Sequence, residues 1–153
     1  MLFRSDSPYQ ANVVIVNTCT VTAEADKEAR QLIRRVAQRN PAAQIIVTGC
    51  YAQRAPDELS EMAGVRFVVG NSHKSLVPEL TLKALKEDPE SDGRAEVFCS
   101  DIFLERELSP VEFPGAAGRT RAVVKVQDGC NANCSFCVIP FVRGRSQIGR
   151  AHV

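Results

Sequence analysis

The sequence predicts an α/β domain built on a parallel β-sheet. Three short runs of β-branched and other apolar residues, at 12–18, 43–50 and 66–71, are separated by stretches with helical spacing. These runs do not alternate polar with apolar residues, a pattern typical of strands buried on both faces of a parallel sheet. The order strand, helix, strand, helix therefore favours βαβ units.

The first predicted strand, NVVIVNT at 12–18, ends just before Cys19, and an amphipathic helix with a basic outer face is predicted to follow it. Thr22 is a suitable N-cap for this helix, and Asn40-Pro41 supplies a stop. The apolar positions recur at helical spacing and are assigned to the core: Val21, Ala25, Ala29, Leu32, Ile33 and Val36.

The second predicted strand, AQIIVTGC, ends in Gly49-Cys50, and a helical stretch follows near 57–62. The third, RFVVGN, ends in Gly70-Asn71. Because the carboxyl ends of parallel strands lie along one edge of a sheet, Cys19 and Cys50 are predicted to occupy equivalent places and to lie close together.

The remaining elements are less regular. A helix is predicted at about 75–87, and the polar stretch EDPESDGRAE after it is a surface loop. Residues 99–119 are rich in proline and glycine and are the best candidate for a linker, after which a strand is predicted at 121–127. We therefore predict a domain boundary near residue 118.

Composition and charge exclude several classes of protein. The chain has 153 residues, of which 44% are hydrophobic, and its formal net charge is +1. Such a charge gives no overall field for a polyanion, so any nucleic-acid contact must come from a local basic patch. No apolar run approaches the roughly 18 to 20 residues of a membrane span, and the first residues lead into no signal peptide. We therefore predict a cytoplasmic protein with no membrane or DNA partner.

Six cysteines would suit three disulfides in a secreted protein, but in a reducing cytosol closely spaced thiols more often bind metal. Cys130, Cys134 and Cys137 form the pattern C-x3-C-x2-C. A zinc site would need a fourth ligand, yet His73 is distant and His152 lies in a doubtful tail. Three thiolates on one loop fit a 4Fe–4S cluster better, because each binds one iron and the fourth iron stays open.

With Phe136 just before its last cysteine, this loop resembles that of the radical S-adenosylmethionine (SAM) enzymes. The segments QDGCNANCSFCVIPFVRGRS, VIVNTCTVTAEADKEARQLIRRV and IIVTGCYAQ resemble the methylthiotransferase branch of that family, over residues 12–146. The resemblance implies an amino-terminal methylthiotransferase domain with its linker over 1–118, then the start of a radical SAM (β/α) partial barrel over 119–147. It also implies that the open iron binds SAM, that an electron from the cluster cleaves SAM to a 5′-deoxyadenosyl radical, and that Phe136 lines the adenine site.

The resemblance further implies a second 4Fe–4S cluster, bound by three cysteines of the amino-terminal domain and involved in supplying sulfur. Cys19 and Cys50 match two of those ligands, and the third is missing because the chain opens shortly before Asn12. The alternative is that Cys19 and Cys50 are buried small hydrophobic residues, as free cysteines often are. Cys99, in the apolar stretch VFCSDIF, has no partner at ligand spacing and is predicted to be a core thiol.

The implied function is radical SAM-dependent 2-methylthiolation of N6-threonylcarbamoyladenosine at position 37 of tRNA, with the anticodon loop as partner. The segments NTCTVT, TGCYAQ and QDGC favour this substrate over isopentenyladenosine in tRNA or a ribosomal-protein aspartate. Arg143 and Arg145 lie next to the cysteine loop and are candidates for contact with RNA or cofactor. Arg34, Arg35 and Arg39 are candidates for contact with RNA phosphates, with a solvated helix face as the equal alternative.

Both ends of the sequence depart from the family pattern. The start lacks the first cluster cysteine, and after RGRS the ending QIGRAHV does not read as a continuation of the barrel. We therefore predict an inactive amino-terminal fragment in which residues 148–153 are a non-native tail. A rival interpretation from another class is a non-catalytic iron–sulfur or zinc-binding module.

Overall fold

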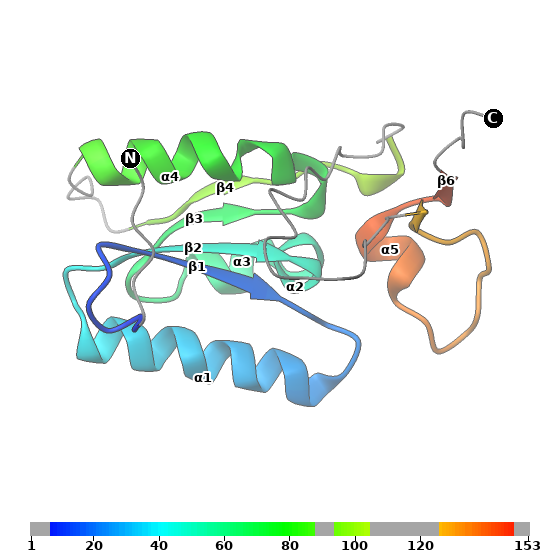
Figure 1. Ribbon diagram of the computed structural model, residues 1–153. Coiled ribbons are helices and arrows are strands. Elements are labelled where there is room, and N and C mark those ends of the chain that lie inside the picture. The colour runs from blue at the N-terminus through cyan, green and yellow to red at the C-terminus, as the bar shows by residue number, and fades with distance from the viewer. Residues whose placement is uncertain (1–6, 88–93, 105–125, 149–153) are drawn as a thin grey trace, which may run out of the picture.

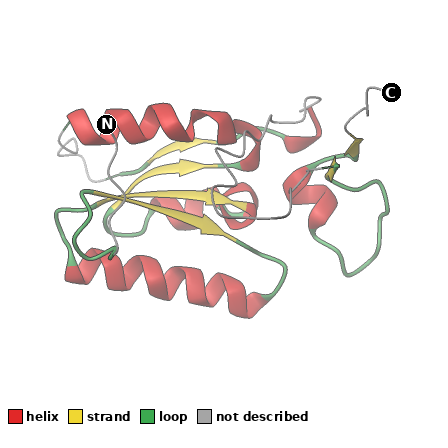
Figure 2. Ribbon diagram, viewed as in Figure 1, coloured by secondary structure: helices red, strands yellow, loops and turns green. Residues whose placement is uncertain are grey.

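The computed structural model describes residues 7–87, 94–104 and 126–148. It confirms the predicted α/β class, with a four-stranded parallel sheet and helices on both of its faces (Figures 1 and 2). The strands of the sheet are β1 (Val13–Thr18), β2 (Gln44–Gly49), β3 (Val65–Val69) and β4 (Glu96–Phe98). The helical segments around it are α1 (Ala23–Arg39), α2 (Cys50–Arg54), α3 (Pro56–Ser60), η1 (Asn71–Leu76), α4 (Val77–Lys86) and η2 (Ile102–Leu104).

A smaller segment lies beyond the carboxyl ends of the strands (Figure 1). It consists of β5 (Gln127–Asp128), a cysteine-containing loop, α5 (Ile139–Arg143) and β6 (Gln147–Ile148). The strands β5 and β6 pair antiparallel, and Gln127 lies opposite Ile148, the first residue of the predicted non-native tail. Helix α5 packs against α2, η1 and η2, so this segment contacts the main sheet domain.

The strands of the main sheet follow the order of the chain, β1-β2-β3-β4, and every neighbouring pair is parallel. All six residues of β2 are buried, which explains why its sequence is apolar without alternation. The register pairs Thr18 with Gly49, the last residues of β1 and β2. Cys19 and Cys50 therefore leave the sheet from equivalent positions on neighbouring strands, as predicted.

The predicted first helix is confirmed by α1. The Thr22 hydroxyl caps it by accepting a hydrogen bond of 3.1 Å from the Ala25 N–H. Ile33 and Val36 are fully buried, and they pack in one core cluster with residues of α2, α3 and the sheet. On the other face of the sheet, α4 places Leu80 in a second cluster built around strand residues such as Phe67.

Among the positions assigned to the core in and before α1, Ala25 is only partly buried and two are exposed. Val21 is 61% exposed and Leu32 is 38% exposed, so the prediction was wrong for both. Val21 precedes the N-cap and therefore lies outside the helix. Leu32 lies at the border of the buried stripe that Ile33 and Val36 form, and it is exposed.

Several short elements were not predicted, among them α2 and β4. The helix α2 begins at Cys50, which the apolar pattern had joined to the preceding strand. The strand β4 has three residues, of which Glu96 and Val97 are exposed, so it lacks the apolar run that reveals a buried strand. The predicted boundary near residue 118, and most of the predicted strand at 121–127, lie outside the described residues.

No helix within residues 7–87, 94–104 and 126–148 has the length and apolar character needed to cross a membrane.

Candidate functional site

The first part of the candidate site is the carboxyl edge of the sheet, where Cys19 follows β1 and Cys50 begins α2. Cys19 is exposed, whereas Cys50 is only 4% exposed. Gly49, between the strand and Cys50, has a φ of +103°, and a Cβ atom there would overlap the carbonyl oxygen of Thr18. Only glycine allows the two strand ends to approach this closely, immediately before the two cysteines.

The second part is the loop between β5 and α5, which carries Cys130, Cys134 and Cys137. All three are free thiols, with Cys134 exposed and the other two partly buried. The Cys137 N–H donates to the Cys134 carbonyl at 3.0 Å, which makes a tight turn between the last two cysteines. The loop therefore presents three thiols toward solvent from a short stretch of backbone.

The predicted arginine-rich turn RGRS fixes the start of this loop. The Cys130 N–H donates to the Gly144 carbonyl at 3.2 Å, and the Ser146 N–H donates to the Asn131 side-chain oxygen at 2.9 Å. Gly144 has a φ of +76°, a conformation that favours glycine. Residues 144–146 thus close the cysteine loop at its base.

The other half of the turn connects the loop to the sheet domain. The Arg143 Nε donates to Cys50 Sγ at 3.5 Å, and Arg143 Nη1 lies 3.6 Å from Asp128 Oδ1. The pKa of Arg143 is raised, first by the hydrogen bond to Cys50 and further by the charges of Cys50, Asp128 and Cys19, while burial acts in the opposite direction. Arg143 therefore lies between the two groups of cysteines.

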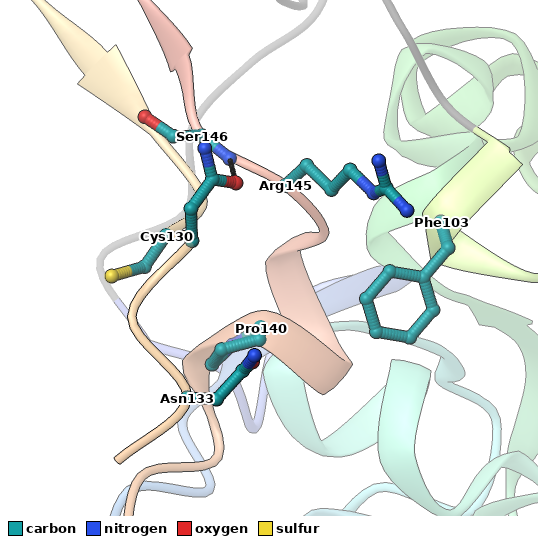
Figure 3. Close-up of a pocket in the computed structure, with 7 residues that line it drawn as sticks. Phe103, Cys130, Asn133, Pro140, Arg145 and Ser146 are labelled. Atoms are coloured by element: carbon teal, nitrogen blue, oxygen red, sulfur yellow. Dashed lines mark hydrogen bonds between the residues drawn. The ribbon is translucent and has the colours of Figure 1, made fainter.

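A cavity of about 400 Å³ lies beside Cys130 (Figure 3). Its lining combines polar side chains with two apolar walls, and it consists of Phe103, Cys130, Asn131, Asn133, Pro140, Arg145 and Ser146. The Arg145 side chain extends toward Phe103, whereas the sulfur of Cys130 points to the opposite side (Figure 3). Phe136 is 91% exposed and is not part of this lining.

The structure does not gather a complete set of metal ligands. Among the described residues, no three side chains of His, Cys, Asp or Glu form a group that could bind a metal ion. The donor types nevertheless fit an iron–sulfur cluster, because the three loop cysteines are free thiols on one short segment and thiolates are the usual ligands of such clusters. Cys19 and Cys50 supply two further thiols of the same kind.

Cys99 and His73, the two residues set aside in the sequence, have local partners. Cys99 is half-buried and its thiol lies 3.8 Å from the Gln53 carbonyl oxygen. Burial raises the pKa of the Cys99 thiol, so this group stays protonated to higher pH than an exposed cysteine. The His73 ring nitrogen Nδ1 lies 3.0 Å from the Ser72 hydroxyl.

Asn71 was not predicted as a site residue. It follows β3 and begins η1, and its side-chain amide donates to the Val142 carbonyl of α5 at 2.7 Å. The available signal was its position: Asn71 follows Gly70 at the carboxyl end of a predicted strand, the same kind of place that singled out Cys19 and Cys50. The partner could not be inferred, because 71 residues separate Asn71 from Val142.

Comparison with known proteins gives consistent matches over most of the chain. A family model described as "Uncharacterized protein family UPF0004" matches residues 3–70. A threonylcarbamoyladenosine tRNA methylthiotransferase MtaB of Aquifex aeolicus is 44% identical over 88% of this chain and 32% of the relative. The MtaB protein of Bacillus subtilis is 40% identical over 92% of this chain and 30% of the relative.

A third relative bears a different name. The ribosomal protein uS12 methylthiotransferase RimO of Campylobacter jejuni is 33% identical over 92% of this chain and 30% of the relative. In each of these comparisons the chain spans about a third of the length of the curated relative that it matches.

Proposed function

We propose that the whole protein is a radical SAM tRNA methylthiotransferase, because the chain is 44% and 40% identical to two MtaB proteins over 88% and 92% of its length. The observation that carries this proposal is the loop Cys130–Cys137, whose three free thiols have the C-x3-C-x2-C spacing and whose flanking helix packs beside Cys50. A simple metal-binding module would need one closed set of ligands. Two separate groups of thiols at the carboxyl edge of the sheet suit an enzyme with two clusters better.

In this proposal Cys130, Cys134 and Cys137 bind a 4Fe–4S cluster, and SAM binds at its open iron. Asn131, Asn133 and Arg145 place polar groups in the cavity beside this loop, and the exposed Phe136, which lies outside the cavity lining, is proposed to provide an aromatic surface for the adenine. When bound, the cluster and SAM supply the one-electron chemistry that removes a hydrogen from C2 of the base. The chain's own share is to orient these groups and to exclude competing reactions.

Cys19 and Cys50 are proposed as two ligands of a second 4Fe–4S cluster that takes part in sulfur delivery. The proposal rests on their positions after neighbouring parallel strands and on the fixed approach of those strands at Gly49. The family pattern calls for a third cysteine in addition to these two. Residues 1–118 would form the methylthiotransferase domain, and 119–147 would begin the radical SAM domain.

The proposed substrate is N6-threonylcarbamoyladenosine at position 37 of tRNA, in keeping with the names of the MtaB relatives, and the proposed location is the cytoplasm. Arg34 and Arg35 are exposed on α1 and, within the described residues, form no ion pair, so they are available to RNA phosphates. The RimO relative raises the ribosomal protein as an alternative substrate. Mass spectrometry of tRNA nucleosides and of the ribosomal protein, from cells with and without the gene, distinguishes the two.

The cluster assignment is tested by anaerobic reconstitution with iron and sulfide. The chain with its loop intact is expected to bind about four irons with a cluster spectrum that SAM perturbs, and Cys134→Ser is expected to lose most of them. Cys99→Ser is the matched control and should retain the iron. Bound zinc in a tetrahedral thiolate site, with no response to SAM, would instead support the non-catalytic module.

A further inference from the structure

The contact between the cysteine-loop segment and the sheet domain centres on one amide. The side-chain nitrogen of Asn71 donates to the carbonyl oxygen of Val142 at 2.7 Å and also lies 3.6 Å from Cys50 Sγ. One amide therefore connects the start of η1, the buried thiol and helix α5. The hydrogen bond to a main-chain carbonyl fixes the position of α5 whatever the side chain of Val142.

A second contact reaches the same thiol from α5 itself. The Arg143 guanidinium donates to Cys50 Sγ at 3.5 Å, and its other end lies 3.6 Å from Asp128 Oδ1, two residues before Cys130. Cys50 thus has one nitrogen donor from η1 and another from α5. Arg143 also connects that thiol with the strand that leads into the cysteine loop.

Burial indicates what these two contacts do. Cys50 is 4% exposed and Val142 is fully buried, whereas Cys19, at the equivalent position on the neighbouring strand, is exposed. The difference between the two cysteines coincides with α5, which packs against α2 and whose Arg143 contacts Cys50. The segment that carries the loop cysteines therefore covers Cys50.

We propose that Asn71 and Arg143 are positioning residues that form a latch, defined by the Asn71–Val142 and Arg143–Cys50 contacts, holding α5 closed over the Cys50 thiol. For catalysis this inference rests on the proposed function, since the latch would keep the two groups of cysteines on one side of the sheet. The latch itself requires no metal, SAM or RNA. Opening it exposes Cys50 while the sheet remains folded.

The latch is tested by alkylating the reduced, metal-free chain with iodoacetamide and following each cysteine by peptide mass spectrometry. Asn71→Asp keeps the shape of the side chain but removes the amide donor, and Arg143→Gln removes the guanidinium. Each variant is expected to raise the alkylation rate of Cys50 about tenfold, because a lost hydrogen bond of this kind shifts local opening by roughly that factor. The rate of Cys99, which is held by Gln53 of α2, should change by less than about twofold.

The matched control is Asn40→Asp at the opposite edge of the sheet. The Asn40 amide donates to the Ala11 carbonyl at 2.9 Å, so the same chemical change removes the same kind of bond away from the latch. The inference fails if Asn40→Asp raises the Cys50 rate as much as Asn71→Asp does, or if both latch variants leave that rate unchanged.

A second measurement applies even if the latch variants do not fold. In the unaltered chain, the Cys50 rate is measured as urea is raised while circular dichroism reports the helices and the sheet. The latch predicts that Cys50 becomes reactive below the urea concentration that unfolds the sheet. If Cys50 becomes reactive only with global unfolding, the latch is refuted, and the iron-binding test of the proposed function is unaffected by either result.

Discussion

Gly49 shows how one residue permits the close approach of two strand ends that precede candidate ligands. Its positive φ and the absence of a side chain allow β2 to end against the backbone of Thr18, immediately before Cys19 and Cys50 leave the sheet. The sequence indicates the residue types and the equivalent positions of the cysteines. It could not give the close approach, because that depends on the register between two strands about 30 residues apart in the chain.

Gly49→Ala is expected to destabilise the fold by about 3 kcal/mol, since a methyl group there meets main-chain atoms that have no room to move. Urea unfolding followed by circular dichroism measures the change. Gly64→Ala is the control, because Gly64 also has positive φ but its added carbon would meet the side chain of Ala37, and a loss nearer 1 kcal/mol is expected. Equal losses for the two variants would count against the close-approach argument.

Tyr51 illustrates a buried titratable residue next to the site. It is fully buried, its hydroxyl accepts a 2.6 Å hydrogen bond from Arg30, and the guanidinium of Arg54 lies 5.2 Å from its ring centre. Burial raises the pKa of Tyr51, and the hydrogen bond from Arg30 acts in the opposite direction without cancelling that effect. The folded chain therefore holds this proton more tightly than the unfolded chain.

This difference predicts how stability depends on pH. Below about pH 10 both states keep the Tyr51 proton and its contribution is constant, whereas above that pH the unfolded state loses the proton first and stability falls. Measured from pH 8 to 11, the free energy of unfolding should fall less steeply in Tyr51→Phe than in the unaltered chain. Parallel curves for the two chains would mean that the proton of Tyr51 is not held more tightly on folding.

At the scale of elements, α1 could be predicted from the spacing of its apolar residues, whereas β4 could not. The helix was predictable because its cap, its stop and its buried stripe lie within one continuous stretch. The three-residue β4 and the five-residue α2 are too short to show a period, and they form through pairing and packing with distant parts of the chain. Even in α1, the pattern alone could not separate the buried stripe from its exposed border, and Leu32 was misassigned.

At the scale of elements, the basic outer face of α1 is predicted to contact tRNA phosphates. Replacing Arg34 and Arg35 together by glutamate is expected to weaken tRNA binding about tenfold at low salt, because two phosphate contacts are reversed in charge. Fluorescence anisotropy with unmodified tRNA measures the effect. Lys83→Glu with Lys86→Glu, on α4 at the other face of the sheet, changes the net charge equally, and the same loss there would show that only overall charge matters.

For the whole molecule, the sequence predicted two groups of cysteines but not their relation. The α/β order follows from local patterns. The resemblance of the cysteine loop to that of radical SAM enzymes indicates its chemistry. The packing of α5 beside Cys50 depends on Asn71, Val142 and Arg143, whose contacts span 71 to 93 residues of chain and leave no local signal. The structure therefore adds the arrangement in which α5, from the segment that carries the loop cysteines, covers Cys50.

The uninterrupted strand order has a consequence for how the molecule is made. Each strand of the sheet pairs with the strand synthesised just before it, so the sheet can grow from β1 to β4 as the chain leaves the ribosome. The surface that receives α5, formed by α2 and η1, is complete before α5 has been translated. The loop cysteines thus arrive after the sheet, on a platform that can already be folded, and Cys50 lacks the cover of α5 until they do.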